Sequence, residues 1–204
     1  MKSYRVAIVG LGRMGSTIDD DVEAGGLWPP NYGVPAGEKV SIAGVCSASG
    51  RLELAAGADT APEQREDFRR RWGVEAVYED FREMIERERP DMVAVCTDGP
   101  DHAEMGVATA NAGVPMLYLE KVIGCSMAEA DAVLEACRGN GTVFNSGVLR
   151  RFDNRYHALR AAIERGEIGE PRAVVFYGAM EVIHNHIHAI DTISYLLGDP
   201  GIEA

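Results

Sequence analysis

A glycine-rich loop near the amino terminus constrains the fold of this chain more than any other feature. Gly10, Gly12 and Gly15 form a GxGxxG pattern directly after the apolar run at residues 4–9 and directly before a helical segment. In that setting the first glycine permits a tight turn, the second lets the backbone approach a pyrophosphate, and the third lets helix and strand pack closely. The helix amino terminus adds free N–H groups and a positive dipole end. The loop therefore predicts a dinucleotide-binding site, and the alternative is a tight turn that holds no ligand.

Short apolar runs alternate with longer amphipathic segments as far as about residue 146, as in a parallel sheet with crossover helices. The expected strands span residues 4–9, 40–46, 76–78, 92–96, 115–119 and 142–145. Residues 92–96 read MVAVC, which is apolar on both faces, so this strand is expected at the centre of the sheet. Residues 25–39 are rich in Gly and Pro and are interpreted as an insertion beside the nucleotide-binding end. The alternation predicts an α/β fold whose first domain spans residues 1–147.

The pattern changes in the last quarter of the chain. Helices are expected at residues 154–165 and 188–197, with one β-rich segment at residues 171–177 between them. A single strand leaves its hydrogen-bonding edge and an apolar face without partners. The second domain, residues 148–204, is therefore expected to be incomplete or to be completed by another chain, and self-association is expected.

Composition excludes several classes of function. The chain has 20 Lys and Arg against 32 Asp and Glu, a net charge of −12, whereas a protein that binds the phosphates of a nucleic acid needs the opposite balance. Every apolar run is shorter than the roughly 18 to 20 residues of a membrane span, and the first run is interpreted as a strand rather than a signal peptide. Cys46, Cys96, Cys125 and Cys137 form no CxxC pair, which favours reduced thiols in a cytoplasmic protein without a disulfide or a zinc ribbon.

The tip of the second strand selects the cofactor in dinucleotide-binding folds, because an acid there binds the ribose 2′-hydroxyl of NAD. With that strand placed at residues 40–46, the tip reads CSASGR and holds no carboxylate. Ser47, Ser49 and Arg51 would suit a 2′-phosphate, since arginine supplies charge-assisted hydrogen bonds. In the alternative, Ser49 caps the next helix and Arg51 lies in solvent. This tip favours NADP and leaves NAD open.

Motifs along nearly the whole chain resemble the Gfo/Idh/MocA oxidoreductases, a family typified by glucose-fructose oxidoreductase and inositol dehydrogenases. In family order they are AIVGLGRMG at residues 7–15, VCT and DH within residues 95–102, YLEK at 118–121, RF at 151–152, GEIGEP at 166–171 and HAID at 188–191. The resemblance implies a Rossmann domain followed by an α+β domain whose large sheet forms the substrate pocket wall and the oligomer contact. Family members are longer than 204 residues, so the chain is expected to be truncated in that second domain or to be an unusually short protein.

The resemblance also implies roles for individual residues. Lys121 would lie between nicotinamide and substrate, Glu120 would contact the cofactor, and His188 would be the acid or base, with Asp191 one helical turn further. His184 stands where the family usually has an acid and is kept as a catalytic candidate. The residues assigned to the cofactor are Gly10, Gly12, Arg13, Met14, Gly15, Ser47, Ser49, Arg51, Thr97, His102 and Glu120.

Two features near these residues need interpretation. Val122 follows Lys121 where the family has proline; a cis bond before a residue other than proline costs about 3 to 4 kcal/mol, so a trans bond and a displaced Lys121 are expected. His184, His186 and His188 have a spacing that would suit a metal in an extended segment, but no fourth ligand stands nearby. No metal is therefore predicted, and a solvent-facing histidine cluster is the plainer interpretation.

Hydride transfer from an alcohol requires a group that takes the hydroxyl proton and a cofactor that takes the hydride. Together with these requirements, the resemblance implies NAD(P)-dependent oxidation of a hydroxyl carbon in a sugar, cyclitol or related polyol, by a homo-oligomer, and this is the favoured function. Two alternatives stay open: a dinucleotide-binding regulator without turnover, and the NAD-dependent glycoside hydrolysis of one branch of the family.

Overall fold

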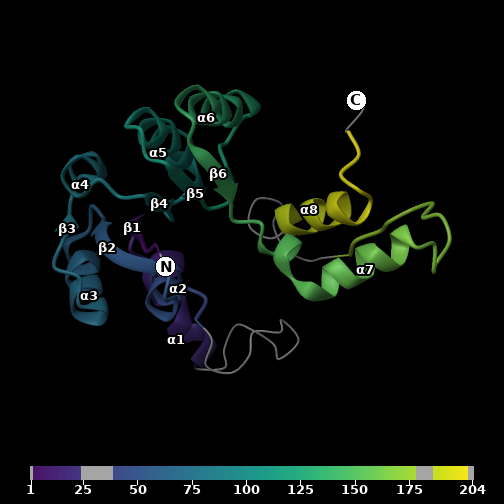
Figure 1. The fold of residues 1–204 in the computed structure, drawn as a ribbon, viewed down its shortest axis with the longest axis horizontal. Helices are drawn as coiled ribbons and strands as arrows, with labels where there is room; N and C mark the ends of the chain where they lie inside the picture. The colour runs from purple at the N-terminus through teal and green to yellow at the C-terminus, as the bar shows by residue number, and fades with distance from the viewer. Residues whose placement is uncertain (1, 24–38, 178–185, 202–204) are drawn as a thin grey trace. The chain divides into compact units, whose positions relative to one another are not determined.

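The computed structural model describes residues 2–23, 39–177 and 186–201 (Figure 1). The chain divides into two compact units, Met1–Ser146 and Gly147–Ala204. The predicted insertion at residues 25–39 falls almost entirely outside the described residues, as does His184.

The first unit is built on a six-stranded parallel sheet in the order β3-β2-β1-β4-β5-β6 (Figure 1). Its strands are β1 (Tyr4–Val9), β2 (Leu52–Ala58), β3 (Val77–Tyr78), β4 (Met92–Val95), β5 (Met116–Leu119) and β6 (Val143–Ser146). The strand order reverses between β1 and β4, and this switch point is where such sheets bind dinucleotides. The predicted Rossmann domain is confirmed, and β4 is central as expected.

Helices cover both faces of the sheet. They are the π-helix η1 (Arg13–Thr17), α1 (Ile18–Glu23), α2 (Ile42–Ala48), α3 (Pro62–Trp72), α4 (Phe81–Glu88), α5 (Gly99–Asn111) and α6 (Met127–Asn140). The start of α4 is fixed by Asp80, whose side chain accepts a hydrogen bond from the backbone N–H of Arg82. The start of α6 is fixed in the same way by Ser126, which accepts from Glu129.

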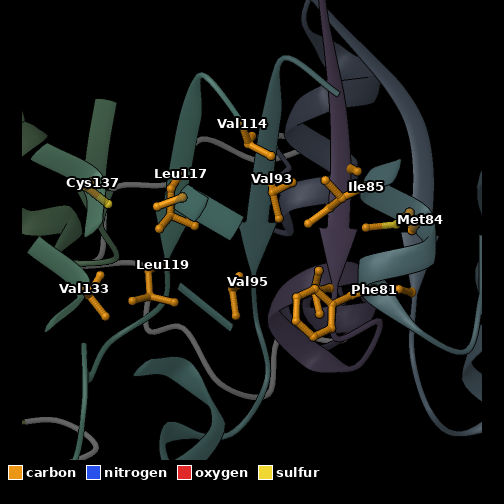
Figure 2. Packing of buried hydrophobic residues seen from close by; sticks show 14 of the residues in the cluster. Phe81, Met84, Ile85, Val93, Val95, Val114, Leu117, Leu119, Val133 and Cys137 are labelled. Atoms are coloured by element: carbon orange, nitrogen blue, oxygen red, sulfur yellow. The ribbon is translucent and has the colours of Figure 1, made fainter. Parts of the chain in front are cut away.

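The two faces have separate hydrophobic cores. On one face, residues of α4, α5 and α6 pack against the middle strands, as Figure 2 shows for Phe81 and Met84 of α4, Val95 of β4, and Val133 of α6. On the other face, α2 and α3 pack against β1 and β4 through a smaller cluster that includes Phe68. The glycine loop after β1 therefore starts from a strand that is buried on both sides.

The predicted second strand is wrong. Most of residues 40–46 belong to helix α2, and the strand is β2, which follows it. Ser41 caps α2 by accepting from the backbone N–H of Gly44, and the buried carboxylate of Asp19 accepts from the Ser41 hydroxyl at 2.5 Å. β2 reads LELAAGA and lacks β-branched residues, so pairing with β1 and β3 sets its position rather than intrinsic propensity.

The second unit contains a 3-10 helix η3 (Leu149–Phe152) and the helices α7 (Asn154–Glu164) and α8 (Ile187–Leu196), close to the two helices expected. Residues 171–177 form no strand and are mostly exposed, contrary to prediction. A strand exists only through hydrogen bonds to a neighbour, and the described residues offer this segment none. Among the helices that the structure describes, none is long and apolar enough to cross a membrane.

Candidate functional site

The glycine loop is packed so closely that two of its glycines have no room for a side chain. Gly10 has φ +85°, and a Cβ there would lie 2.8 Å from backbone atoms of Cys96. A Cβ on Gly15 would lie 2.1 Å from the carbonyl oxygen of Gly10. A Cβ on Gly12, by contrast, would meet no atom within 4 Å. The protein itself therefore does not require glycine at position 12, and the open backbone there fits the close approach of a pyrophosphate.

Asp59 lies at the mouth of this loop, directly after β2. Its Oδ2 accepts a hydrogen bond from the backbone N–H of Leu11 at 2.8 Å, and its Oδ1 accepts from Ala61 at 2.9 Å. The tip of the second strand thus carries an acid. The tip expected from the sequence had none, because the second strand was expected at residues 40–46 and lies at Leu52–Ala58. Proline is favoured in the first turn of a helix, and Pro62 begins α3. It is therefore the sequence signal that the strand has ended before this position.

The residues proposed to hold a 2′-phosphate lie elsewhere. Ser47 is in the last turn of α2, Ser49 caps that helix at its carboxyl end, and Arg51 directly precedes β2. The carbonyl oxygen of Arg51 accepts from the backbone N–H of Tyr4, where β1 begins. These residues are therefore at the amino ends of the strands, opposite the glycine loop, and the argument for NADP loses its basis.

A cavity of about 370 Å³ adjoins the loop. It is lined by the carboxyl ends of β1 and β2, by residues 79–82 after β3, and by Thr97 and part of α5. A larger cavity of about 500 Å³ lies at the opposite edge of the sheet, around Pro90 and Pro115. Only the smaller one includes Gly10 and Asp59, so it is the candidate for the adenosine part of a dinucleotide.

Arg13 and Met14 occupy the first turn of η1, and Arg13 forms an ion pair with Asp21 of α1 at 2.8 Å. Because this pair is exposed, it contributes little to stability, and the guanidinium of Arg13 can also bind an anion at the loop. Ser16, fully buried in the same helix, accepts a hydrogen bond from the indole N–H of Trp72 on α3. This bond ties the glycine loop to the helix that follows β2.

Glu120 follows β5 and is almost fully buried beside the loop that carries Lys121. Its Oε1 accepts from the hydroxyl of Tyr118 at 2.7 Å, and its Oε2 lies 3.3 Å from the backbone nitrogen of Lys121, which donates to it. Burial and the neighbouring Glu120 raise the pKa of the Tyr118 hydroxyl far above its usual value. The pKa of the Cys96 thiol, after β4, is raised by the same two causes. The carboxylate therefore faces neutral hydrogen-bond donors.

The peptide bond between Lys121 and Val122 is cis, so the expected trans bond is wrong. The side chain of Lys121 is half-buried.

His102, assigned to the cofactor from the sequence, is buried in α5 with 1% of its surface exposed. Its Nδ1 lies 2.5 Å from the carbonyl oxygen of Val122 and its Nε2 lies 2.9 Å from that of Thr97. Both polar atoms of the ring are therefore engaged with the backbone, and neither is left for a cofactor.

In the second unit, the structure places His188 in the first turn of α8 and Asp191 one turn later. Asp191 accepts from Nε of Arg151 at 2.5 Å, and Arg151 also donates to Asp199 at 2.7 Å. These two carboxylates raise the pKa of Arg151, which stays charged. Asp191 is therefore a charge-paired residue that fixes α8, a role that the sequence did not indicate.

Comparisons with known proteins agree with this geometry. The GFO_IDH_MocA family model, described as an oxidoreductase family with an NAD-binding Rossmann fold, matches residues 4–148. Myo-inositol 2-dehydrogenase of Thermotoga maritima is 31% identical over 116 residues, which are 57% of this chain and 34% of that protein. The NAD⁺-dependent scyllo-inositol 2-dehydrogenase of Bacillus subtilis is 32% identical over 106 residues, 52% of this chain and 31% of that protein.

Solved structures show the same fold over both units. A scyllo-inositol dehydrogenase from Lactobacillus casei, solved with NAD(H) and scyllo-inositol, has a TM-score of 0.75 and 21% identity. That comparison covers 97% of this chain and 56% of the other. GenD2 from gentamicin A biosynthesis, in complex with NAD, has a TM-score of 0.76 and 20% identity over 100% of this chain and 56% of the other. The chain thus spans little more than half the length of these structures.

Proposed function

Because the chain belongs to the Gfo/Idh/MocA family of NAD-binding oxidoreductases, we propose that it acts in the NAD-dependent oxidation of a hydroxyl carbon in a cyclitol or related polyol. The observation that carries this proposal is the pairing of an open backbone at Gly12 with the carboxylate of Asp59 at the mouth of the same loop. The first feature suits a pyrophosphate and the second suits the hydroxyls of an adenosine ribose.

Asp59 favours NAD over NADP. Each carboxylate oxygen accepts one backbone N–H and has a further lone pair, so a ribose 2′-hydroxyl can donate to it. A 2′-phosphate in the same place would bring two negative charges together. A cation could offset that repulsion. Arg65 is hydrogen-bonded to this segment, but its guanidinium already donates to the backbone carbonyl oxygens of Asp59 and Thr60.

The catalytic roles follow the family resemblance. A bound nicotinamide ring would accept the hydride from the substrate carbon. The resemblance assigns transfer of the hydroxyl proton to His188, and it assigns stabilisation of the oxygen, as it becomes a carbonyl, to the ammonium group of Lys121. Glu120 accepts a hydrogen bond from the backbone of Lys121 through its Oε2, and the resemblance gives it a contact with the cofactor. Cyclitols are favoured as substrates because the relatives described above are inositol dehydrogenases.

Binding and turnover test the proposal separately. We expect the chain to bind NADH more tightly than NADPH in a fluorescence titration. Reduction of NAD⁺ in the presence of myo-inositol, scyllo-inositol or glucose then tests the reaction, and the reverse reaction is tested with the matching ketone. NADH binding without any turnover would favour the regulatory alternative, and release of free sugar from a glycoside without net NADH formation would favour the hydrolase. Absence of binding to either dinucleotide would contradict all three.

A further inference from the structure

His102 contacts two separate segments of backbone at once. It belongs to α5, close to the helix start at Gly99, and its ring is buried. Nδ1 lies 2.5 Å from the carbonyl oxygen of Val122 and Nε2 lies 2.9 Å from the carbonyl oxygen of Thr97. The ring therefore fills the space between the loop after β4 and the loop after β5.

Both contacts of the ring are with acceptors. A carbonyl oxygen accepts hydrogen bonds and cannot donate them, so a ring N–H of His102 is the donor. The charged residues closest to His102 along the chain are Asp101 and Glu104 on α5 and Asp98, the N-cap of that helix; Glu120 and Lys121 directly precede Val122.

The two carbonyl groups belong to functionally distinct loops of the candidate site. Thr97 lines the cavity beside the glycine loop, and Val122 follows Lys121 directly. β4 and β5 are adjacent parallel strands, so their following loops lie at the same edge of the sheet. The side chain of Val122 is close to α5 as well, because a Cβ on Gly99 would lie 3.2 Å from its Cγ2.

We propose that His102 is a positioning residue for Lys121: its buried ring contacts the Thr97 and Val122 carbonyl groups and so fixes the backbone that presents Lys121. This inference rests on the proposed function only for the role of Lys121 toward the nicotinamide. The geometry of the His102 contacts is independent of it. His102 thus acts through another residue and touches neither cofactor nor substrate.

The contact between His102 and the Lys121 backbone is tested first, by NMR on the wild type and two variants. His102→Gln keeps one amide donor group, and His102→Leu keeps none. We therefore expect the backbone amide signals of Lys121 and Val122 to shift more in His102→Leu than in His102→Gln. Unchanged signals at 121 and 122 in both variants would overturn the proposal.

The coupling to Lys121 is tested with a double-mutant cycle on NADH affinity. His102→Leu and Lys121→Ala are each expected to weaken binding by on the order of tenfold, and the double variant is expected to be no weaker than Lys121→Ala alone. His102→Gln should recover part of the loss. Thr109→Val, a buried change in the same helix, is the matched control and should leave affinity unchanged.

The outcomes separate this inference from the proposed function. Additive losses in the cycle, or a loss in His102→Leu with none in Lys121→Ala, would overturn the positioning role while NADH binding itself persists. If the wild type does not bind NADH, the proposed function fails, and the NMR result alone decides whether His102 holds the Lys121 backbone.

Discussion

The carboxylate of Asp59 accepts a hydrogen bond from the backbone N–H of Leu11 at 2.8 Å, which joins the end of β2 to the centre of the glycine loop. The adjacent Gly10 donates its backbone N–H to the carbonyl oxygen of Ala58 at 2.9 Å. The loop conformation and the acid proposed to select the cofactor are therefore parts of one hydrogen-bonded arrangement.

Asp59→Ala is expected to weaken NADH binding by about tenfold or more, because hydrogen bonds to charged groups contribute about 1.5 to 3 kcal/mol. NADPH binding should weaken less or improve, since a negative charge beside its 2′-phosphate is removed. Fluorescence titration of both dinucleotides measures the ratio. Arg51→Ala is the control. A change in the ratio of NADH to NADPH affinity in this variant would support the cofactor site that the sequence predicted around Arg51.

Gly12 and Gly15 are expected to respond differently to alanine. Gly15→Ala places a methyl group 2.1 Å from the carbonyl oxygen of Gly10, so the loop must move, and a loss of at least about 1 to 3 kcal/mol of stability is expected. Gly12→Ala meets no protein atom and should keep the melting temperature while weakening NADH binding. Thermal denaturation and titration of both variants distinguish these effects, and equal destabilisation would contradict the open space at Gly12.

The buried thiol of Cys46 is expected to make the free energy of unfolding fall as the pH becomes alkaline. Burial raises the pKa of its thiol from about 9 to about 11 in the folded chain, so the unfolded chain loses this proton first as the pH rises. The contribution of the neutral thiol is therefore complete below about pH 9 and is lost between about pH 9 and 11, with a slope of at most about 1.4 kcal/mol per pH unit.

Urea unfolding of the wild type and of Cys46→Ala between pH 8 and 11 measures this slope. We expect a smaller decline in Cys46→Ala, and an unchanged decline would assign it to other groups. Cys125 is exposed and serves as the control position, since Cys125→Ala should leave the slope as it is.

The fold was predictable from the sequence to the extent that local signals and burial agreed. β4 is apolar on both faces and central, and the helix caps Asp80 and Ser126 accept hydrogen bonds from backbone N–H groups only two and three residues further along the chain. The position of β2 was predicted wrongly because two local signals conflicted. Residues 40–46 are rich in apolar and β-branched side chains, while the true strand has Ala and Gly at its buried end. Pairing with β1 decides the strand, and pairing is not visible in a local window.

The part of the candidate site that depends on local backbone conformation, the glycine loop, was predictable from the sequence. The glycines of the loop were found because a tight turn and close packing require them. Asp59 was missed together with its strand, and the contacts of His102 were missed because they join residues 5 and 20 positions away. Asp191 was found by resemblance, but its partner Arg151 is 40 residues away and no spacing rule connects them.

Arg151→Ala is expected to destabilise α8 by about 1 to 3 kcal/mol, because Asp191 then keeps a largely buried carboxylate without its cation. Arg151→Lys should recover little, since one ammonium group cannot replace Nε toward Asp191 and Nη2 toward Asp199 together. Hydrogen exchange of the α8 amides measures the effect. Arg172→Ala, which removes an exposed pair with Glu170, is the control and should leave exchange unchanged.

The second unit is expected to drive self-association. Phe152, Val175, Phe176 and Tyr177 each have at least half of their surface exposed, and a group of large apolar side chains of this kind in water favours association. Sedimentation velocity over a concentration series should therefore show oligomers whose fraction rises with concentration. The combined change Val175→Ser, Phe176→Ser should shift the equilibrium toward monomer, because it removes apolar surface while the helices α7 and α8 stay intact. Met127→Ser, which removes an equally exposed apolar side chain from the first unit, is the control. If both changes have the same small effect, association does not run through residues 171–177.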